Sequence, residues 1–260
     1  MLTLISHFYN EEFLLPYWLE HHTKLFDHGV MIDYQSTDRS VEIIRDLAPN
    51  WEIRPSRNNE FDAYSLDAEV IDIEQEIKGW KMCLNTTEFL IHHDLRSDVV
   101  EFEKVLPGYI GMQTAGIWMV DAPHEFNQPV DGQPLFFQRH YGWFEPVPSA
   151  GGSRHRLLHR AETGRYYTGR HWTAHKEVAY RPEMFCAWFG WSPYPQVKQR
   201  KMQIQTRIPR THIGTALGIE HQISSEQMDA NFHIYSNSAV DLLEDPTYKN
   251  AIDLVKKHLY

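Results

Sequence analysis

The first 95 residues alternate between short apolar runs and longer segments whose apolar residues recur with the period of a helix. The apolar runs predict buried strands at residues 2–8, 30–33, 51–54 and 89–91. Each segment between two of these runs predicts one helix. The resulting β-α-β-α-β-α-β order implies a mostly parallel sheet with right-handed crossovers.

The longest predicted helix stands just before the fourth predicted strand. Its apolar residues follow one another at spacings of 4, 3, 4, 3 and 4, which is typical of a single stripe along a helix. These residues are Leu66, Val70, Ile73, Ile77, Trp80 and Leu84. The helix is expected to lead directly into the strand at 89–91.

The pattern changes after about residue 99. The segments 109–121 and 134–144 are strand-like and rich in aromatic residues, whereas 197–207 and 248–259 have helical patterns, the first of them basic. The second half of the chain therefore predicts a mixed arrangement of strands and helices rather than further parallel units.

Potential metal ligands follow the fourth predicted strand without a gap, in the sequence His92-His93-Asp94. In open α/β sheets, ligands bind beyond the carboxyl ends of the strands. The alternative is an ordinary polar turn after a strand, and these residues alone do not decide between the two.

Composition narrows the class of protein. With 260 residues, 42% apolar content and 23% charged residues, the chain suits one large globular domain. A formal charge of −10 argues against nucleic acid as a partner, because phosphate backbones require a basic face. Sixteen histidines favour a metal or acid–base site without locating it.

Targeting signals are sparse in this sequence. No apolar run approaches the length of a membrane span, and the first residues lack the basic start of a signal peptide. The two cysteines, Cys83 and Cys186, form no CxxC pair, which fits a reducing compartment. A cytoplasmic location is therefore expected, with peripheral attachment to a membrane left open. Neither GxGxxG nor GxxxxGK[ST] occurs, so no dinucleotide fingerprint or P-loop supports the sheet.

Two motifs of the first half carry a family likeness. The first strand ends in Phe8-Tyr9-Asn10-Glu11-Glu12, and the second is followed by Asp33-Tyr34-Gln35-Ser36-Thr37-Asp38-Arg39-Ser40. In this order the chain resembles GT-A type glycosyltransferases, most closely their family-2-like and family-92-like group. Those proteins have an N-E-E turn after the first strand, a D-x-x-S-x-D-x-[ST] turn after the second and a D-x-D metal motif after the fourth. The resemblance covers roughly residues 1–100.

The resemblance implies a fold and a function. The fold is a single α/β, GT-A-like domain over residues 1–260, with a Rossmann-like sheet, helices on both of its faces and a mixed C-terminal part. Residues 1–100 would bind a nucleotide-diphosphate sugar, and 101–260 would form the acceptor side. The function is that of a hexosyl- or pentosyltransferase to a hydroxyl of a glycan, polysaccharide or glycoconjugate, inverting and assisted by a metal.

The same resemblance assigns metal ligands. His92-His93-Asp94 takes the place of D-x-D and keeps only the second carboxylate, so Asp94 would bind the metal and His92 would replace the lost group. An imidazole ligand favours Mn²⁺ over Mg²⁺. The third ligand is expected to be His175, with His171 and His221 as alternatives. A histidine that merely satisfies hydrogen bonds is the plainer interpretation of each.

The remaining site residues follow from the three needs of glycosyl transfer: a donor pocket, neutralisation of the diphosphate and a base for the acceptor. The base is expected to be Asp121, with Glu125 as the alternative. Arg200 and Lys201 are further candidates for the diphosphate, although a solvated basic helix face is the plainer interpretation of both. The residues expected to bind the nucleotide-sugar are Phe8, Tyr9, Asn10, Glu11, Asp33, His92 and Arg170.

Two other functions stay open. The degenerate D-x-D is also compatible with a relative that binds a nucleotide or glycan without turnover. The histidines are compatible with a metal-dependent hydrolase, but the chain has no HExxH or other ligand pair at a firm spacing.

Overall fold

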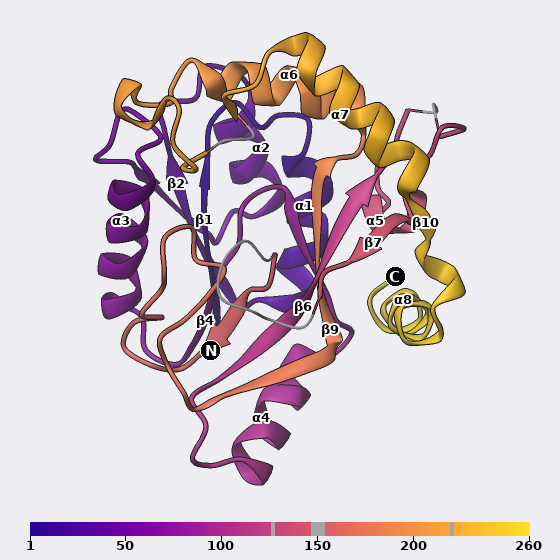
Figure 1. The fold of residues 1–260 in the computed structure, drawn as a ribbon. Helices are drawn as coiled ribbons and strands as arrows, with labels where there is room; N and C mark the ends of the chain where they lie inside the picture. Colours follow the sequence, from indigo (N-terminus) through magenta and orange to yellow (C-terminus); the bar gives the residue numbers. More distant parts are fainter. Residues whose placement is uncertain (126–127, 147–153, 219–220) are drawn as a thin grey trace.

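The computed structural model describes residues 1–125, 128–146, 154–218 and 221–260, which form a mixed ten-stranded sheet with helices on both faces (Figure 1). The first part of the chain forms β1 (Leu2–Phe8), α1 (Leu15–Leu25), β2 (His28–Asp33), α2 (Ser40–Leu47), β3 (Glu52–Pro55), α3 (Ala63–Glu76), β4 (Trp80–Cys83) and β5 (Glu88–Ile91). The second part forms α4 (Leu95–Val105), β6 (Gly111–Val120), α5 (Leu135–Gln138), β7 (Tyr141–Phe144), β8 (Leu157–His159), β9 (Val178–Trp191), α6 (Tyr194–Gln205), α7 (Ser225–Ser238), β10 (Val240–Asp241) and α8 (Pro246–Leu259).

The first four strands build the parallel half of the sheet, in the order β3-β2-β1-β4. Side chains alternate along β1: Leu4 and Phe8 enter the core that α1 and α2 cover, whereas Ile5 packs on the opposite face with Val70 and Ile73 of α3. The expected α/β class with helices on both faces is thus confirmed.

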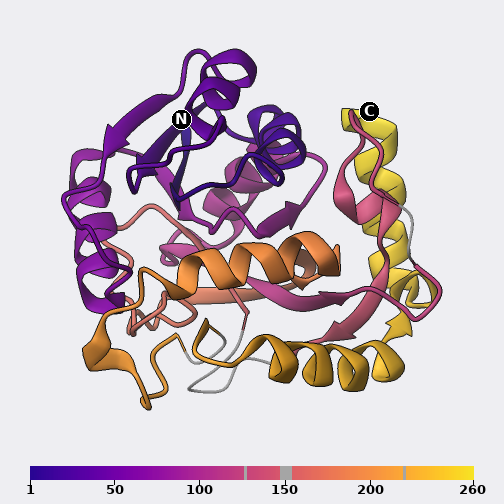
Figure 2. The same ribbon diagram turned by 90° about the horizontal axis from the view of Figure 1, so that it is seen from above.

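Strands of the second half extend this sheet beyond β4, while β3 stays at the other edge. β8 pairs antiparallel with β4, β6 pairs antiparallel with β8, and β9 runs parallel to β6. β6 and β9 therefore point the same way as β1. Their carboxyl ends lie together with those of β1 and β4, and α6 and α7 cross this edge of the sheet (Figures 1 and 2).

The prediction of one long helix that reaches Leu84 is wrong for the second part of that segment. α3 ends at Glu76, Gly79 takes a positive φ of 96°, and β4 begins at Trp80. A positive φ is readily adopted only by glycine and is incompatible with a continuing helix. Trp80 and Leu84 continue the helical spacing of α3 by coincidence, since they are buried from a strand and from the residue after it.

Because of this error, the fourth strand was also assigned to the wrong residues. The fourth strand of the parallel set is β4, which pairs with β1 on the side away from β2. The predicted strand at 89–91 belongs to β5, which pairs antiparallel with β9. Because β9 runs with β1, β5 runs against it. The turn His92-His93-Asp94 therefore leaves the sheet at the edge opposite to the carboxyl ends of β1 and β4, where α4 begins (Figure 1).

The other boundaries differ less from the prediction. α1 begins at Leu15 and keeps Pro16 in its first turn, where a missing N–H costs nothing. The predicted strand-like segment 134–144 divides into α5 and β7. None of the helices in the described ranges has the length and hydrophobicity that a bilayer span requires.

Candidate functional site

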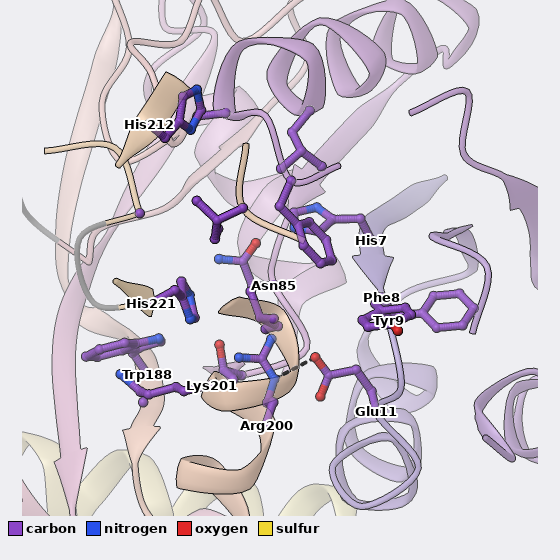
Figure 3. A pocket seen from close by; sticks show the side chains of 18 of the residues that line it. His7, Phe8, Tyr9, Glu11, Asn85, Trp188, Arg200, Lys201, His212 and His221 are labelled. Carbon is purple, nitrogen blue, oxygen red and sulfur yellow. Dashed lines mark hydrogen bonds and ion pairs between the residues drawn. The ribbon is translucent and has the colours of Figure 1, made fainter. Parts of the chain in front are cut away.

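A pocket opens where β1, β4 and β9 end, beneath α6 (Figure 3). We call it the strand-end pocket. Its volume is about 190 Å³, and it continues into a wider hollow of about 600 Å³ with which it shares Ala63, Arg154, Gly218 and His221. The side chains that matter for its chemistry are His7, Phe8, Tyr9, Glu11, Asn85, Thr87, Arg154, Trp188, Arg200, Lys201, His212 and His221.

The two family-like motifs form interlocked turns beside this pocket. The backbone N–H of Asn10 donates to Oγ of Ser36 (3.1 Å), and the N–H of Thr37 donates to Oδ1 of Asn10 (2.8 Å). The N–H of Glu12 donates to Oδ2 of Asp38 (3.0 Å), so Asp38 braces its turn. Asn10 holds a positive φ of 52°, which asparagine tolerates better than most residues. Asn10 thus joins the turns, and it is not among the residues that line the strand-end pocket.

Glu11 is the motif carboxylate that enters the pocket. Its backbone N–H donates to Oγ of Ser40 (2.8 Å), and its carboxylate accepts from Nε of Arg200 (2.6 Å). Burial raises the pKa of Glu11, and the guanidinium of Arg200 offsets part of that effect. Asp33, in contrast, accepts from the N–H of Ser36 (2.9 Å) and serves the turn. Of the predicted donor-binding residues, Phe8, Tyr9 and Glu11 therefore line the pocket.

The turn after β4 stands where the family-like pattern places D-x-D, and it reads Asn85-Thr86-Thr87. The backbone N–H of Asn85 donates to the carboxylate of Glu88 (2.7 Å), and its Oδ1 accepts from Nη2 of Arg170 (3.3 Å). Asn85 and Thr87 line the pocket. This turn offers amide and hydroxyl groups but no carboxylate, so it does not fit the divalent cation that the resemblance implies.

Arg170 supports this turn from behind. It is 4% exposed, pairs with Asp67 and is not among the residues that line the strand-end pocket. Arg170 takes a positive φ of 61°, and its guanidinium donates to Oδ1 of Asn85. Arg170 therefore does not line this pocket, because its charge is paired within the protein, and its contact with a donor stays a prediction.

Among the residues that the structure describes, three lysine or arginine side chains line the pocket. Lys201 is 2% exposed and its Nζ lies 4.1 Å from the ring centre of Trp191. The guanidinium of Arg154 lies 3.6 Å from the ring centre of Trp188. Arg200 completes the set through its pair with Glu11. A solvated basic face of α6 is excluded for Lys201, since the side chain is buried.

The electrostatic balance of the pocket is opposite to that of the chain. Among the described lining residues, Arg154, Arg200 and Lys201 face a single acid, Glu11, in a protein with a formal charge of −10. His7, which also lines the pocket, has a pKa well below its usual value because of burial first and then the charges of Arg170, Arg200 and Arg156. A pocket of this character favours an anionic ligand.

The predicted metal ligands lie elsewhere. Asp94 is the N-cap of α4 and accepts from the backbone N–H of Ser97 (3.1 Å). His92 approaches Oδ2 of Asp98 (3.5 Å) at the same edge of the sheet, opposite to the strand-end pocket. His92 is therefore also excluded as a donor contact in this pocket.

The third predicted ligand does not join them. Nε2 of His175 interacts with the backbone carbonyl of Thr163 (2.9 Å). Across the described ranges, no three His, Cys, Asp or Glu side chains are arranged to hold a metal ion. The set of Asp94, His92 and His175 is thus not assembled. His221 lines the strand-end pocket and His171 lines the wider hollow.

Replacing Asp94 tests this placement directly. Asp94→Ala should lower the free energy of unfolding by about 1 kcal/mol, because it removes the N-cap of α4. Ligand affinity at the strand-end pocket should stay unchanged. Asp94→Ser, which keeps a capping oxygen, is the matched control, and both quantities follow from urea unfolding and calorimetry. A loss of ligand affinity in Asp94→Ala but not in controls of equal stability would contradict the placement.

The predicted bases line a separate cavity at the start of α6. Both carboxylate oxygens of Asp121 are engaged, by the hydroxyl of Ser192 and by the backbone N–H of Tyr194 (2.7 Å), and Arg139 lies 3.2 Å away. Glu125 shares this cavity, and burial raises the pKa of both acids. The structure does not bring Asp121 or Glu125 to the strand-end pocket, and their role as base stays a prediction.

Sequence reasoning missed Asn85, Thr87 and Arg154. A signal for the first two was present: Gly79 interrupts the helical stripe, and a polar triplet separates two apolar runs, which together indicate a strand, a turn and a second strand. Nothing in the local pattern around Arg154 indicates a pocket.

No family model matches the chain, and no curated protein matches it. Among solved structures, S. aureus TarS 1–349 has a TM-score of 0.42 at 14% identity, over 99% of this chain and 80% of that one. The same TarS fragment in complex with UDP-GlcNAc gives 0.39 at 12% identity, over 99% and 81%. HddC from Yersinia pseudotuberculosis gives 0.42 at 8% identity, over 77% and 99%. Likenesses at this level do not show which family the chain belongs to.

Proposed function

We propose that the protein is a glycosyltransferase that uses a nucleotide-diphosphate sugar. The observation that carries the proposal is the strand-end pocket itself: a cation-lined cavity in an acidic chain, built where the first strand and its N-E-E turn meet the end of β4. Ligands of open α/β sheets bind at this edge. The family-like motifs add support, because their interlocked turns shape the wall of this pocket.

The pocket provides for both ends of such a donor. Tyr9 and Phe61 form an apolar side on which a base and ribose can pack. Arg200 and Lys201 lie on the side formed by α6, where a diphosphate would be neutralised (Figure 3). The wider hollow beyond Arg154 contains Trp118 and offers room for the acceptor.

The proposed reaction is the transfer of the sugar to an acceptor hydroxyl. The bond between the anomeric carbon and the β-phosphate oxygen breaks, and its electron pair leaves with the nucleoside diphosphate. An acceptor hydroxyl oxygen forms the new bond to the anomeric carbon and gives its proton to a base. Basic side chains at the leaving group stabilise the charge that develops there. Inversion at the anomeric carbon stays a prediction, which a product with the configuration of the donor would contradict.

A binding protein without turnover is the second candidate. It is favoured by one observation: among the described lining residues the one carboxylate, Glu11, is paired with Arg200 and is not a ready base. The two candidates share nucleotide binding and differ in transfer.

The test is a thermal-shift panel of UDP, GDP, CDP and dTDP. One of them should raise the unfolding temperature, since a ligand at 100 times its Kd stabilises the native state by about 2.7 kcal/mol. Lys201→Gln should reduce the shift, because it removes a positive charge from the diphosphate side of the pocket, and Asp94→Ala should leave it intact. The corresponding nucleotide-sugars are then incubated with glycan acceptors, and release of the nucleoside diphosphate is measured.

The two readouts separate the candidates. Acceptor-dependent release of nucleoside diphosphate supports the transferase. A thermal shift without release for any donor and acceptor supports the binding protein. No shift with any nucleotide would contradict both.

A further inference from the structure

We propose that the strand-end pocket binds a diphosphate without a divalent cation, with Arg154, Arg200 and Lys201 supplying the positive charge that a metal ion would otherwise provide. The identification of that diphosphate as part of a nucleotide rests on the proposed function. The anion site itself rests on the side chains that surround the turn after β4.

The turn after β4 and the pocket around it offer few ligands for a divalent cation. Mg²⁺ and Mn²⁺ are held in proteins chiefly by carboxylate oxygens. The turn Asn85-Thr86-Thr87 has none, and Oδ1 of Asn85 already accepts from Arg170. Glu11, the one acid among the described lining residues, is paired with Arg200 at 2.6 Å. A divalent ion bound to Glu11 would meet the guanidinium of Arg200 at the same carboxylate.

The positively charged side chains of the pocket are held in place by contacts within the protein. Arg200 and Lys201 are consecutive in α6 and both line the pocket, so they lie on one rigid element. Lys201 is fixed against Trp191, Arg154 is stacked over Trp188, and Arg200 is held by Glu11. Side chains fixed before binding lose little conformational freedom when an anion arrives. Figure 3 shows Asn85, Arg200 and Lys201 gathered around the same space.

The net charge of the whole protein is opposite in sign to that of the pocket. With a formal charge of −10, the protein as a whole repels anions, so an anion site requires a local concentration of positive charge. Arg156 and Arg170 lie behind the pocket, but they are paired with Glu88 and Asp67. The positive charge among the described lining residues is therefore that of Arg154, Arg200 and Lys201. Ammonium and guanidinium groups both form charge-assisted hydrogen bonds with phosphate oxygens.

The experiment uses inorganic pyrophosphate as the probe, titrated into the full chain by calorimetry in EDTA and again with excess Mn²⁺. We expect binding in EDTA with an affinity that Mn²⁺ does not improve. Lys201→Gln and Arg200→Gln should each weaken binding about tenfold or more, the loss expected for a charged hydrogen bond. Lys201→Arg should retain most of the affinity.

Lys198→Gln is the matched control. It removes the same charge from the same helix, but Lys198 pairs with Asp229 and does not line the strand-end pocket. Its affinity for pyrophosphate should equal that of the wild type. Circular dichroism and unfolding temperature verify that each variant is folded, and the EDTA and Mn²⁺ titrations of the wild type do not depend on any variant.

The outcomes separate this inference from the proposed function. Binding of pyrophosphate or nucleotide only with Mn²⁺ would overturn the inference and leave the glycosyltransferase proposal standing. Equal affinities of Lys201→Gln, Arg200→Gln and Lys198→Gln would also overturn it. Pyrophosphate binding in EDTA that depends on Lys201 would support the inference. If, in addition, no nucleotide binds more tightly than pyrophosphate, the inference would still stand, but the proposed function would be contradicted.

Discussion

The free energy of unfolding should fall steeply as the pH is lowered from 6.5 towards 4, because α1 buries two neutral histidines against β5. Burial lowers the pKa of His21 from 6.5 to about 4, with the carbonyl of Leu90 opposing this effect and the charge of Lys24 adding to it. The pKa of His22 also lies well below 6.5, first because of burial and then because of His21.

The hydrogen bonds of His22 show why a second proton is unfavourable. Its Nδ1 lies 2.8 Å from the carbonyl oxygen of Trp18, and its Nε2 accepts from the backbone N–H of Leu90 (3.2 Å). The neutral ring satisfies both contacts, with the proton on Nδ1. A proton on Nε2 would face the N–H of Leu90 and remove that hydrogen bond. His21, between the carbonyl of Leu90 and the hydroxyl of Tyr260, is opposed chiefly by burial.

The sign and size of the effect follow from linkage. In this pH range the unfolded chain binds protons that the folded chain excludes, so stability rises with pH and is lost on acidification. The difference between 6.5 and about 4 for His21 corresponds to about 3 kcal/mol, at about 1.4 kcal/mol per pH unit. Burial raises the pKa of Glu11 and Asp121, which acts in the opposite direction at the acid end. A loss of this size is a large fraction of the stability of a typical domain.

Urea unfolding at a series of pH values measures this dependence. His21→Gln and His22→Gln keep polar side chains that do not titrate, so each should reduce the slope between pH 6.5 and 4. His124, an exposed histidine, provides the control, and His124→Gln should leave the slope unchanged. A free energy of unfolding that stays constant across this range in the wild type would contradict the assignment of neutral, buried rings.

The sequence predicted the parallel half of the fold because its information there is local. The apolar runs of β1, β2 and β3 alternate with helical segments, and the turn residues Asn10 and Asp38 act on their immediate surroundings. Each of these features involves one strand, one turn or one pair of neighbouring turns. Patterns of period 2 and 3.6 are sufficient for such elements.

The sequence did not place the candidate site correctly, because the positions of its residues depend on contacts between elements that are far apart in the sequence. The direction of β5 is fixed by its antiparallel register with β9, in which Glu88 lies opposite Trp188, and nothing near residue 88 encodes that partner. The apolar run before His92 is identical whether the strand points towards the pocket or away from it. In the same way, Lys201 has the local sequence of a solvated residue and is buried by Trp191, which lies in a different element.

Replacing Glu88 with alanine should lower the free energy of unfolding by about 3–5 kcal/mol, the range found when one partner of a buried ion pair is removed. Glu88 is fully buried, and its carboxylate accepts two hydrogen bonds from the guanidinium of Arg156, which is 1% exposed. The same carboxylate accepts from the backbone N–H of Asn85 (2.7 Å). Glu88→Ala would therefore leave a buried guanidinium uncompensated and release the turn that borders the strand-end pocket.

A double-mutant cycle separates the ion pair from its role in the turn. Glu88→Leu combined with Arg156→Met should cost much less than the sum of the single substitutions, because apolar residues can replace a buried pair without leaving a charge behind. Glu42→Ala, which breaks the exposed pair of Arg39 and Glu42, should leave stability unchanged. The double variant should nevertheless bind pyrophosphate poorly, since Asn85 would have lost the acceptor for its N–H. Normal pyrophosphate affinity in the double variant would show that the turn after β4 holds its shape without Glu88 and that the two roles are independent.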